Sequence, residues 1–321
     1  MSVTFNVPVS TTTGATPSHR AIHTAAMSSP KASTTRGDSA RQGIRRAWPA
    51  VRSVLLFLLF LAAWFLLLAV AGSPTDALVR VTRATPAGAR LIYEVVPLLT
   101  VLIPTIVFGL VFRRYAGIPV LTLARREGVD TAVGMGMGLG LIVVAAGALW
   151  ALGSLSFSGI SMWDGSLAIW VLALALNAAF QEYLVHGWGF DVMLRGCGPV
   201  VATIITTVAF ALFHPGAFEV GPMAVACIAA FGILLALLRL LSGGLLAPIL
   251  VHAVWNILGG IGLGLVTLAD DYPHVLDGAL SGSPLLANGM GLESSLTTLA
   301  LLVATSAVLL VLYLRRPRAA R

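Results

Sequence analysis

Apolar stretches of about twenty residues recur along this chain, and they constrain its fold more than any other feature. In lipid, every backbone N–H and C=O group must find a partner within the protein, so only helices and closed barrels cross a membrane. Hydrophobic residues make up 58% of the sequence and charged residues only 10%, whereas a soluble domain has about 25% charged residues. The sequence therefore predicts an all-α, polytopic membrane helix bundle.

About eight of these stretches are long enough to cross a hydrocarbon core of roughly 30 Å as helices. We expect the helices at residues 51–72, 91–112, 132–155, 166–194, 200–218, 223–241, 245–268 and 295–314. The third stretch contains Gly134, Gly136, Gly138 and Gly140, which form two overlapping small-xxx-small patterns and predict close packing against a neighbouring helix. A nucleotide-binding glycine loop is disfavoured, because no strand precedes these glycines and the whole segment is apolar.

The stretches divide the chain into five parts. These are a disordered basic tail at 1–45, helices one to three within 46–165, a core of helices four to seven within 166–268, an outer loop at 269–294, and the last helix with a basic tail at 295–321. The first part is rich in Ser, Thr, Ala and Arg, so it cannot bury enough apolar surface to fold. An organellar transit peptide is the alternative for it, because such peptides are rich in Ser and Arg and poor in acids.

Arginines account for almost all of the net charge of +7, and they flank the apolar stretches. This placement favours a topology signal over a nucleic-acid-binding surface. Arginine runs precede the first stretch and follow the last one, and Arg195 and Arg239 are expected in other loops of the same side. Because cytosolic loops carry the excess of arginine, both termini are predicted to be cytosolic.

Several polar side chains interrupt the apolar stretches, although a charged group at the centre of a membrane helix costs about 3 kcal/mol. They are Glu182, His186, His214, His252 and Asn256. At 1.5 Å per residue, four of them, all but His186, lie at depths of roughly 12–22 Å from one membrane face. Costly groups at similar depths on separate helices predict one shared site.

These residue types suit the hydrolysis of an amide bond, which needs an activated water, a base and donors for an oxyanion. Glu182 can accept a proton as the base. His214 can relay a proton or bind zinc as the neutral imidazole. His252 and Asn256 lie one turn apart on one helix face and can donate to the oxyanion.

Three short motifs contain these residues, and each pairs side chains four residues apart on one helix face. They are Gln181-Glu182-x-x-x-His186, Phe210-x-x-x-His214 and His252-x-x-x-Asn256, on the fourth, fifth and seventh stretches. In this order they resemble the motifs of the CPBP family, which includes CAAX proteases and the bacteriocin-processing and self-immunity proteins also called Abi. The family motifs are Glu-Glu-x-x-x-Arg, Phe-x-x-x-His and His-x-x-x-Asn, and the resemblance covers about residues 170–260.

The resemblance implies an integral membrane endopeptidase that hydrolyses a peptide bond in a membrane-associated peptide or protein. The catalytic residues that it implies are Glu182, His214, His252, Asn256 and Gln181, with His186 and Phe210 as substrate-contacting or orienting residues. It implies either a zinc site that uses His214 and His252 or a metal-free mechanism of glutamate and histidine, and the residues do not distinguish the two. The expected partners are the lipid bilayer and the substrate, without nucleic acid, in a prokaryotic plasma membrane.

The first motif departs from the family at two positions. Gln181 stands where the family has its first glutamate, and His186 stands where it has arginine. A neutral amide cannot accept a proton, so either Glu182 serves as the base or catalysis is weakened. A catalytically impaired relative that acts as a membrane binding or immunity protein is therefore the alternative function. A proton-coupled transporter is a third hypothesis, but no inverted repeat or pair of broken helices is visible.

Overall fold

The structure, a computed structural model, describes residues 36–116, 123–161, 163–266, 272–282 and 291–317. Contacts between residues divide the chain into two units, Met1–Ile44 and Arg45–Arg321. The expected disordered tail at 1–45 lies mostly outside the described residues. Its last residues differ from the expectation, because the first helix already begins at Arg36.

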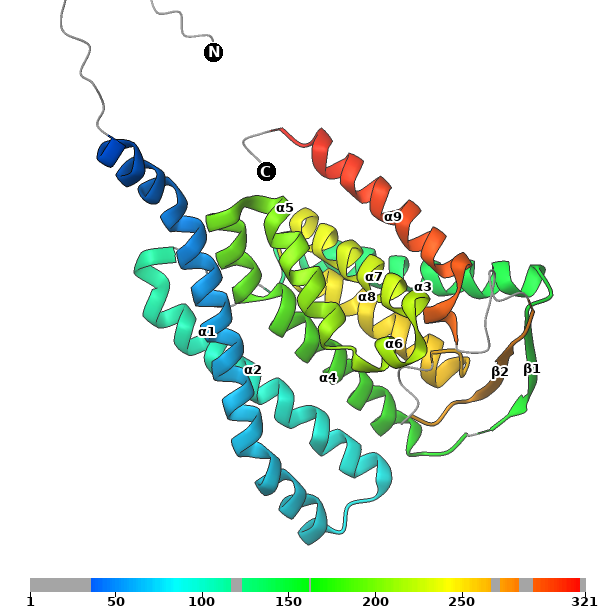
Figure 1. Ribbon diagram of the computed structural model, residues 1–321. Coiled ribbons are helices and arrows are strands. Elements are labelled where there is room, and N and C mark those ends of the chain that lie inside the picture. The colour runs from blue at the N-terminus through cyan, green and yellow to red at the C-terminus, as the bar shows by residue number, and fades with distance from the viewer. Residues whose placement is uncertain (1–35, 117–122, 162, 267–271, 283–290, 318–321) are drawn as a thin grey trace, which may run out of the picture. The chain divides into compact units, whose positions relative to one another are not determined.

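Helices account for most of the second unit, as Figure 1 shows. The α-helices are α1 (Arg36–Thr82), α2 (Pro86–Ala116), α3 (Glu127–Ala151), α4 (Leu167–His186), α5 (Trp188–Leu212), α6 (Pro215–Val220), α7 (Pro222–Ser242), α8 (Leu246–Asn256) and α9 (Leu296–Arg315). A π-helical turn, η1 (Ile257–Gly262), continues α8, and a short 3₁₀ turn, η3 (Leu292–Ser294), precedes α9. The prediction of a helical membrane bundle is confirmed.

Six helical stretches in the described part of the chain are long and apolar enough to cross a membrane. One of them, Leu167–Leu212, is 46 residues long and consists of α4 and α5, which are separated at Gly187. The apolar stretch Leu246–Gly262 is shorter and contains α8 and η1. With the break at Gly187 and this shorter stretch, the apolar helices agree with the eight that the sequence predicts. Their orientation stays a prediction.

The boundary between the fourth and fifth predicted helices is wrong. The sequence predicts a helix to residue 194 and a new one from residue 200, whereas α4 ends at His186 and α5 begins at Trp188. At Gly187 an added Cβ would overlap the carbonyl group of Tyr183, so the chain can turn there only without a side chain. The expected boundary is a kink within α5, where Gly198 has φ +79° and Pro199 follows.

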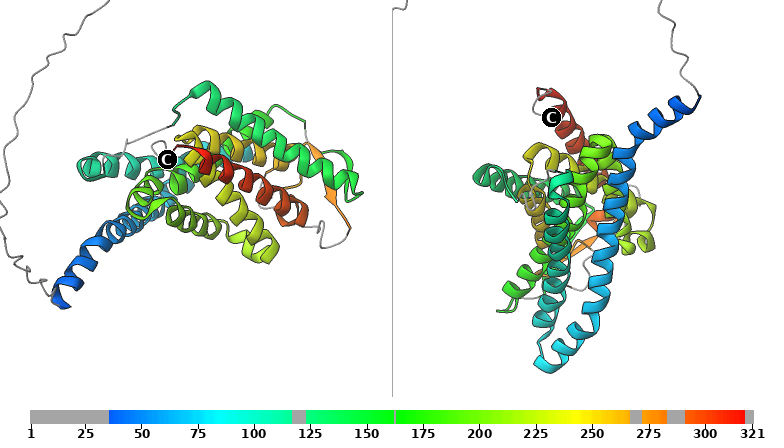
Figure 2. Two further views of the ribbon diagram at one scale, coloured as in Figure 1. Left: turned by 90° about the horizontal axis from the view of Figure 1, so that it is seen from above. Right: turned by 90° about the vertical axis from the view of Figure 1, so that its left-hand side faces the viewer.

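The expected outer loop at 269–294 contains regular structure that the sequence analysis missed. Strand β2 (Leu276–Leu280) pairs in antiparallel fashion with β1 (Leu155–Ile160), which follows α3. The two paired strands are far apart in the sequence, and Figures 1 and 2 show them next to each other beyond the end of α3. Over the described ranges the fold is therefore helical, with one small two-stranded sheet.

The glycine pattern of α3 packs this helix against α8, as predicted. A Cβ added at Gly134 would lie 2.7 Å from Cβ of Leu250, and one at Gly138 would lie 2.7 Å from Cβ of Val254. At Gly136 nothing lies within 4 Å of an added Cβ, so only one of the two overlapping patterns faces α8. Figures 1 and 2 show α3 beside α8, which is the helix that carries His252.

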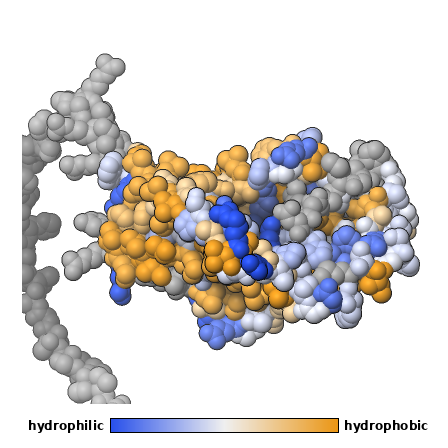
Figure 3. All heavy atoms as spheres, turned by 90° about the horizontal axis from the view of Figure 1, so that it is seen from below, coloured by the Kyte–Doolittle hydropathy of each residue, from blue (hydrophilic) through white to orange (hydrophobic). Residues whose placement is uncertain are grey.

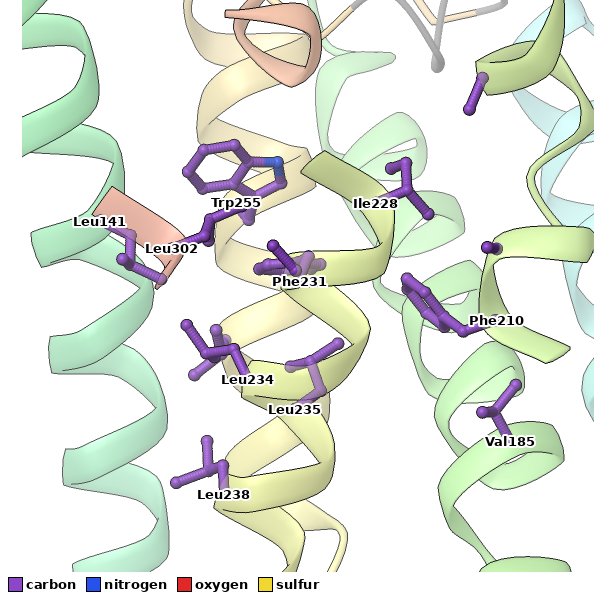
Figure 4. Packing of buried hydrophobic residues seen from close by; sticks show 14 of the residues in the cluster. Leu141, Val185, Phe210, Ile228, Phe231, Leu234, Leu235, Leu238, Trp255 and Leu302 are labelled. Carbon is purple, nitrogen blue, oxygen red and sulfur yellow. The ribbon is translucent and has the colours of Figure 1, made fainter. Parts of the chain in front are cut away.

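Buried aromatic and aliphatic side chains fill the space between α5, α7 and α8 (Figure 4). Phe210 of α5, Phe231 of α7 and Trp255 of α8 are each at most 3% exposed. In contrast, many leucines and valines of the helices are exposed on the outside, and Figure 3 shows a broad continuous apolar area on one face. Such an area suits lipid rather than water, so the protein is an integral membrane protein.

Candidate active site

Glu182 of α4 lies at the centre of a cluster of imidazole rings. Its side chain is fully buried, and each of its two carboxylate oxygens has a histidine partner. Nδ1–H of His186 donates to Oε2 at 2.7 Å, and Nδ1–H of His252 donates to Oε1 at 2.9 Å. An ionised carboxylate accepts both bonds, whereas a protonated one would keep only one oxygen as a full acceptor. Glu182 therefore links a histidine of its own helix to a histidine of α8.

His214 joins the cluster through the ring of Phe210. Its Nδ1–H donates to the carbonyl oxygen of Phe210 at 2.7 Å, because a carbonyl can only accept. The other ring nitrogen, Nε2, is then the atom left for chemistry. The Phe210 ring centroid lies 4.5 Å from that of His214, 5.6 Å from that of His252 and 6.1 Å from that of His186. The three imidazoles therefore surround one phenyl ring.

The local sequence explains why His214 is not held inside a helix. The α5 helix ends at Leu212, and Pro215 begins the short helix α6, so His214 occupies the junction between them. Proline supplies no N–H group and is favoured at the first position of a helix, which sets this junction. The prediction that the fifth helix continues to residue 218 is therefore wrong, and the histidine is half-buried at a bend.

Asn256 is the last residue of α8, one turn beyond His252, and its side chain is half-buried. It shares the helix face of His252 as predicted, but among the described residues it makes no side-chain hydrogen bond to the other predicted site residues. The amide group of Asn256 is thus available to a bound molecule. Asn256 is assigned to the cluster only because it lies four residues after His252 on α8.

Gln181 makes its hydrogen bond outside the cluster, to Asn177 of its own helix. Its Nε2 donates to Oδ1 of Asn177 at 2.8 Å, and Asn177 in turn donates to Glu94 at 2.8 Å. Consecutive residues of a helix are about 100° apart, which agrees with the separate directions of Gln181 and Glu182. The structure therefore brings together Glu182, His186 and His252 by hydrogen bonds and His214 by ring contact, whereas Gln181 belongs to a neighbouring network.

An ion pair that the sequence analysis missed supports the C-terminal end of α4. Arg239 was expected in a loop, but it lies within α7 and is only 5% exposed. One of its terminal nitrogens donates to both carboxylate oxygens of Asp191 at 2.7 and 2.8 Å, and its Nε donates to the carbonyl oxygen of His186 at 3.2 Å. Arg239 therefore joins α7 to the last residue of α4 and to the first turn of α5.

Zinc requires at least three ligands from the protein in most sites. No three His, Cys, Asp or Glu side chains within the described ranges are arranged to hold a metal ion. Both oxygens of Glu182 and Nδ1 of His252 are used in hydrogen bonds within the cluster. The arrangement therefore does not fit a three-ligand zinc site, and the expected zinc stays a prediction for His214 and His252.

A signal in the sequence pointed to three of the missed residues. Glu94, Asp191 and Arg239 are charged residues inside apolar stretches, which is the criterion that selected Glu182. Asp191 and Arg239 lie near the ends of their stretches, where polar groups are common and the signal is weak. Tyr272 has no such signal, because it lies in the expected outer loop. Only the contacts between helices show that these residues pair.

Comparison with protein families agrees with this site. Residues 163–258 match the family described as type II CAAX prenyl endopeptidase, Rce1-like. The matched segment contains α4 to α8 and all three motifs, and so it contains every residue of the cluster. No curated protein and no solved structure was found to match the chain. The segment that assembles the buried glutamate and the three histidines is therefore similar to the type II CAAX prenyl endopeptidases, which confirms the resemblance predicted from the motifs.

Proposed function

We propose that this protein is an intramembrane endopeptidase that hydrolyses a peptide bond in a membrane-associated polypeptide. The observation that carries the proposal is the buried Glu182 carboxylate hydrogen-bonded to His252, next to His214 and within a segment similar to an endopeptidase family. Burying an anion between imidazoles is costly for a membrane helix and suits a group that handles protons.

The geometry favours Glu182 and His252 acting as a pair. Glu182 holds Nδ1–H of His252, so Nε2 of His252 is the basic atom that can take a proton from a water molecule. The resulting imidazolium is stabilised by the Glu182 anion, and the hydroxide attacks the carbonyl carbon of the substrate. When the C–N bond breaks, Nε2–H of His252 returns the proton to the leaving amine, so no net proton is consumed.

His214 and Asn256 would serve the other needs of the reaction. Because Nδ1–H of His214 donates to Phe210, Nε2 of the neutral ring can accept a hydrogen bond from the attacking water and orient it. The Asn256 amide can donate to the oxyanion without changing its charge. No step in this scheme passes through a metal.

The test is cleavage of a membrane-anchored fluorogenic peptide by the purified full chain in liposomes. His252→Ala should abolish cleavage, whereas His274→Ala should retain it, since His274 pairs only with Asp277 outside the cluster. Equal activity of both variants would contradict the proposal. The same assay with a chelator tests the role of a metal. Loss of cleavage on chelation, with recovery when zinc is added, would support His214 and His252 as ligands.

A catalytically impaired membrane protein is the second candidate, and Gln181 favours it. The amide at the position of the family's first glutamate cannot take a proton, and both oxygens of Glu182 already accept imidazole N–H groups. In this case the parent chain would be silent in the cleavage assay, and a carboxylate introduced at position 181 would create activity. That carboxylate would also meet Asn177, the present hydrogen-bond partner of Gln181.

A further inference from the structure

A second buried network runs from α2 to α4 beside the site. Glu94 of α2 is only 4% exposed. Its Oε1 accepts a hydrogen bond from the Tyr272 hydroxyl at 2.9 Å, and its Oε2 accepts one from Nδ2 of Asn177 at 2.8 Å. Arg90 forms an ion pair with Oε1 at 2.8 Å, and its Nε donates to the Tyr272 hydroxyl at 2.9 Å. Figure 1 shows α2 next to α4, and the two helices are in contact. Glu94 thus links Arg90, Tyr272 and the amides of α4.

The charge of Glu94 sets the direction of the two amides that follow it. A carboxylate only accepts, so Asn177 must turn its NH₂ group toward Glu94 and its Oδ1 toward Gln181. Oδ1 also only accepts, so Gln181 must turn its NH₂ group toward Asn177 at 2.8 Å. The oxygen of Gln181 is left to face the other way. Glu94 thus fixes the orientation of the Asn177 amide, and Asn177 fixes that of the Gln181 amide.

The side-chain oxygen of Gln181 is buried without a hydrogen bond. Oε1 of Gln181 has no hydrogen-bond partner among the described residues, although a buried polar atom without a partner costs about 1–3 kcal/mol. Gln181 precedes Glu182 and occupies the position where the family has its first glutamate. Its oxygen therefore presents an acceptor, as a carboxylate oxygen would, but without the charge.

We propose that Glu94 is a positioning residue that, through Asn177, holds the oxygen of Gln181 as an uncharged acceptor beside the cluster, where it supports the reacting groups by hydrogen bonding and takes no proton. This inference rests on the proposed endopeptidase function for its catalytic part, and the hydrogen-bond order itself does not depend on that function. Arg90 and Tyr272 hold Glu94 in place, because Arg90 forms an ion pair with the oxygen that accepts from the Tyr272 hydroxyl.

A glutamate introduced at position 181 would conflict with Glu94. The new side chain would offer only acceptor oxygens, so Asn177 would have to donate to both carboxylates through one NH₂ group, or turn Oδ1 toward one of them. Either arrangement sets two anions across a single amide, which is unfavourable in a buried site. Glu94 and a second carboxylate at position 181 therefore exclude each other, and Glu94→Gln removes the conflict.

The experiment is a double-mutant cycle of Gln181→Glu and Glu94→Gln in the full chain. We expect Gln181→Glu alone to lower the melting temperature in detergent and to lower kcat by about tenfold or more, as for a hydrogen bond to a charged group. The double variant should recover most of both losses. Glu94→Gln alone should lower kcat with little change in KM. The substitution no longer fixes the orientations of the Asn177 and Gln181 amides, and residue 94 does not contact the substrate.

Asp130→Asn combined with Gln181→Glu is the matched control. Asp130 is another buried carboxylate, which accepts from the backbone N–H groups of Arg125 and Arg126 and lies outside the network. This combination should not rescue Gln181→Glu. The inference would be overturned if the changes in melting temperature caused by Gln181→Glu and Glu94→Gln were additive in the double variant.

The two readouts separate the inference from the proposed function. If the parent chain cleaves no peptide but the melting temperatures show rescue, the hydrogen-bond order stands and the endopeptidase proposal fails. If the parent cleaves the peptide and the substitutions act additively on both readouts, the endopeptidase stands and the role of Glu94 is refuted.

Discussion

Replacing Gly138 with alanine tests whether the contact between α3 and α8 positions His252, the proposed base. A Cβ at this position would lie 2.7 Å from Cβ of Val254 and 3.2 Å from the carbonyl oxygen of Val251. Carbon atoms in ordinary contact are about 3.5–4.0 Å apart, so α3 and α8 would have to separate by roughly 1 Å. Because His252 lies between these two α8 residues in the sequence, its 2.9 Å bond to Glu182 would be strained.

The expected magnitudes follow from this displacement. Overpacking costs about 1–3 kcal/mol, which exceeds or offsets the roughly 1 kcal/mol that alanine gains over glycine in a helix. A misplacement of about 1 Å in a catalytic group lowers the rate about 100-fold. Gly136→Ala is the matched control, since nothing lies within 4 Å of its added Cβ and only the helix gain applies.

The assay measures thermal unfolding in detergent and kcat for peptide cleavage in liposomes for the two variants side by side. We expect Gly136→Ala to be at least as stable as the parent with unchanged kcat, and Gly138→Ala to unfold at a lower temperature than Gly136→Ala with a strongly reduced kcat. Equal melting temperatures and equal rates for the two variants would refute the argument that α3 sets the position of α8.

Two further substitutions test the buried charges. Glu182→Gln keeps the shape of the side chain but cannot accept from both His186 and His252, so kcat should fall by about 100-fold or more, and a loss below about tenfold would contradict the role of the carboxylate. Arg239→Met leaves the charge of Asp191 without its partner and should destabilise the protein by about 3–5 kcal/mol in chemical or thermal unfolding. Arg239→Met with Asp191→Leu should recover most of that loss, and equal stability of the single and double variants would show that the pair has no structural role.

Much of the site could be predicted because its spacing is local. Four residues of an α-helix make about one turn, so His252 and Asn256 had to share a face, and Gly134 and Gly138 likewise. The structure confirms that Gly134 and Gly138 face a neighbouring helix, and it brings Glu182 and His252 into hydrogen-bonding distance. The cost of burying polar groups in apolar helices explains why these residues could be selected from a single sequence.

Other features could not be predicted because they depend on which helices adjoin. Arg239 lies two residues before the expected end of a long apolar stretch, where an arginine usually marks a loop, and only α5 beside α7 makes Asp191 its partner. The β1–β2 pair joins segments more than a hundred residues apart, and its short strands have no strong alternation of polar and apolar residues. The break at Gly187 leaves no trace in hydropathy, since both flanks are apolar.

The sequence by itself determined that the chain forms membrane helices and that an acid, three histidines and an amide interrupt its apolar stretches. Hydropathy and helical spacing are properties of neighbouring residues, so they can be read along the chain. The tertiary structure alone decided that Glu182 bridges His186 and His252, and that Gln181 instead joins Asn177 and Glu94. These pairings follow from the packing of α4 against α2 and α8, where a turn of about 100° between consecutive residues sends each side chain to a different neighbour.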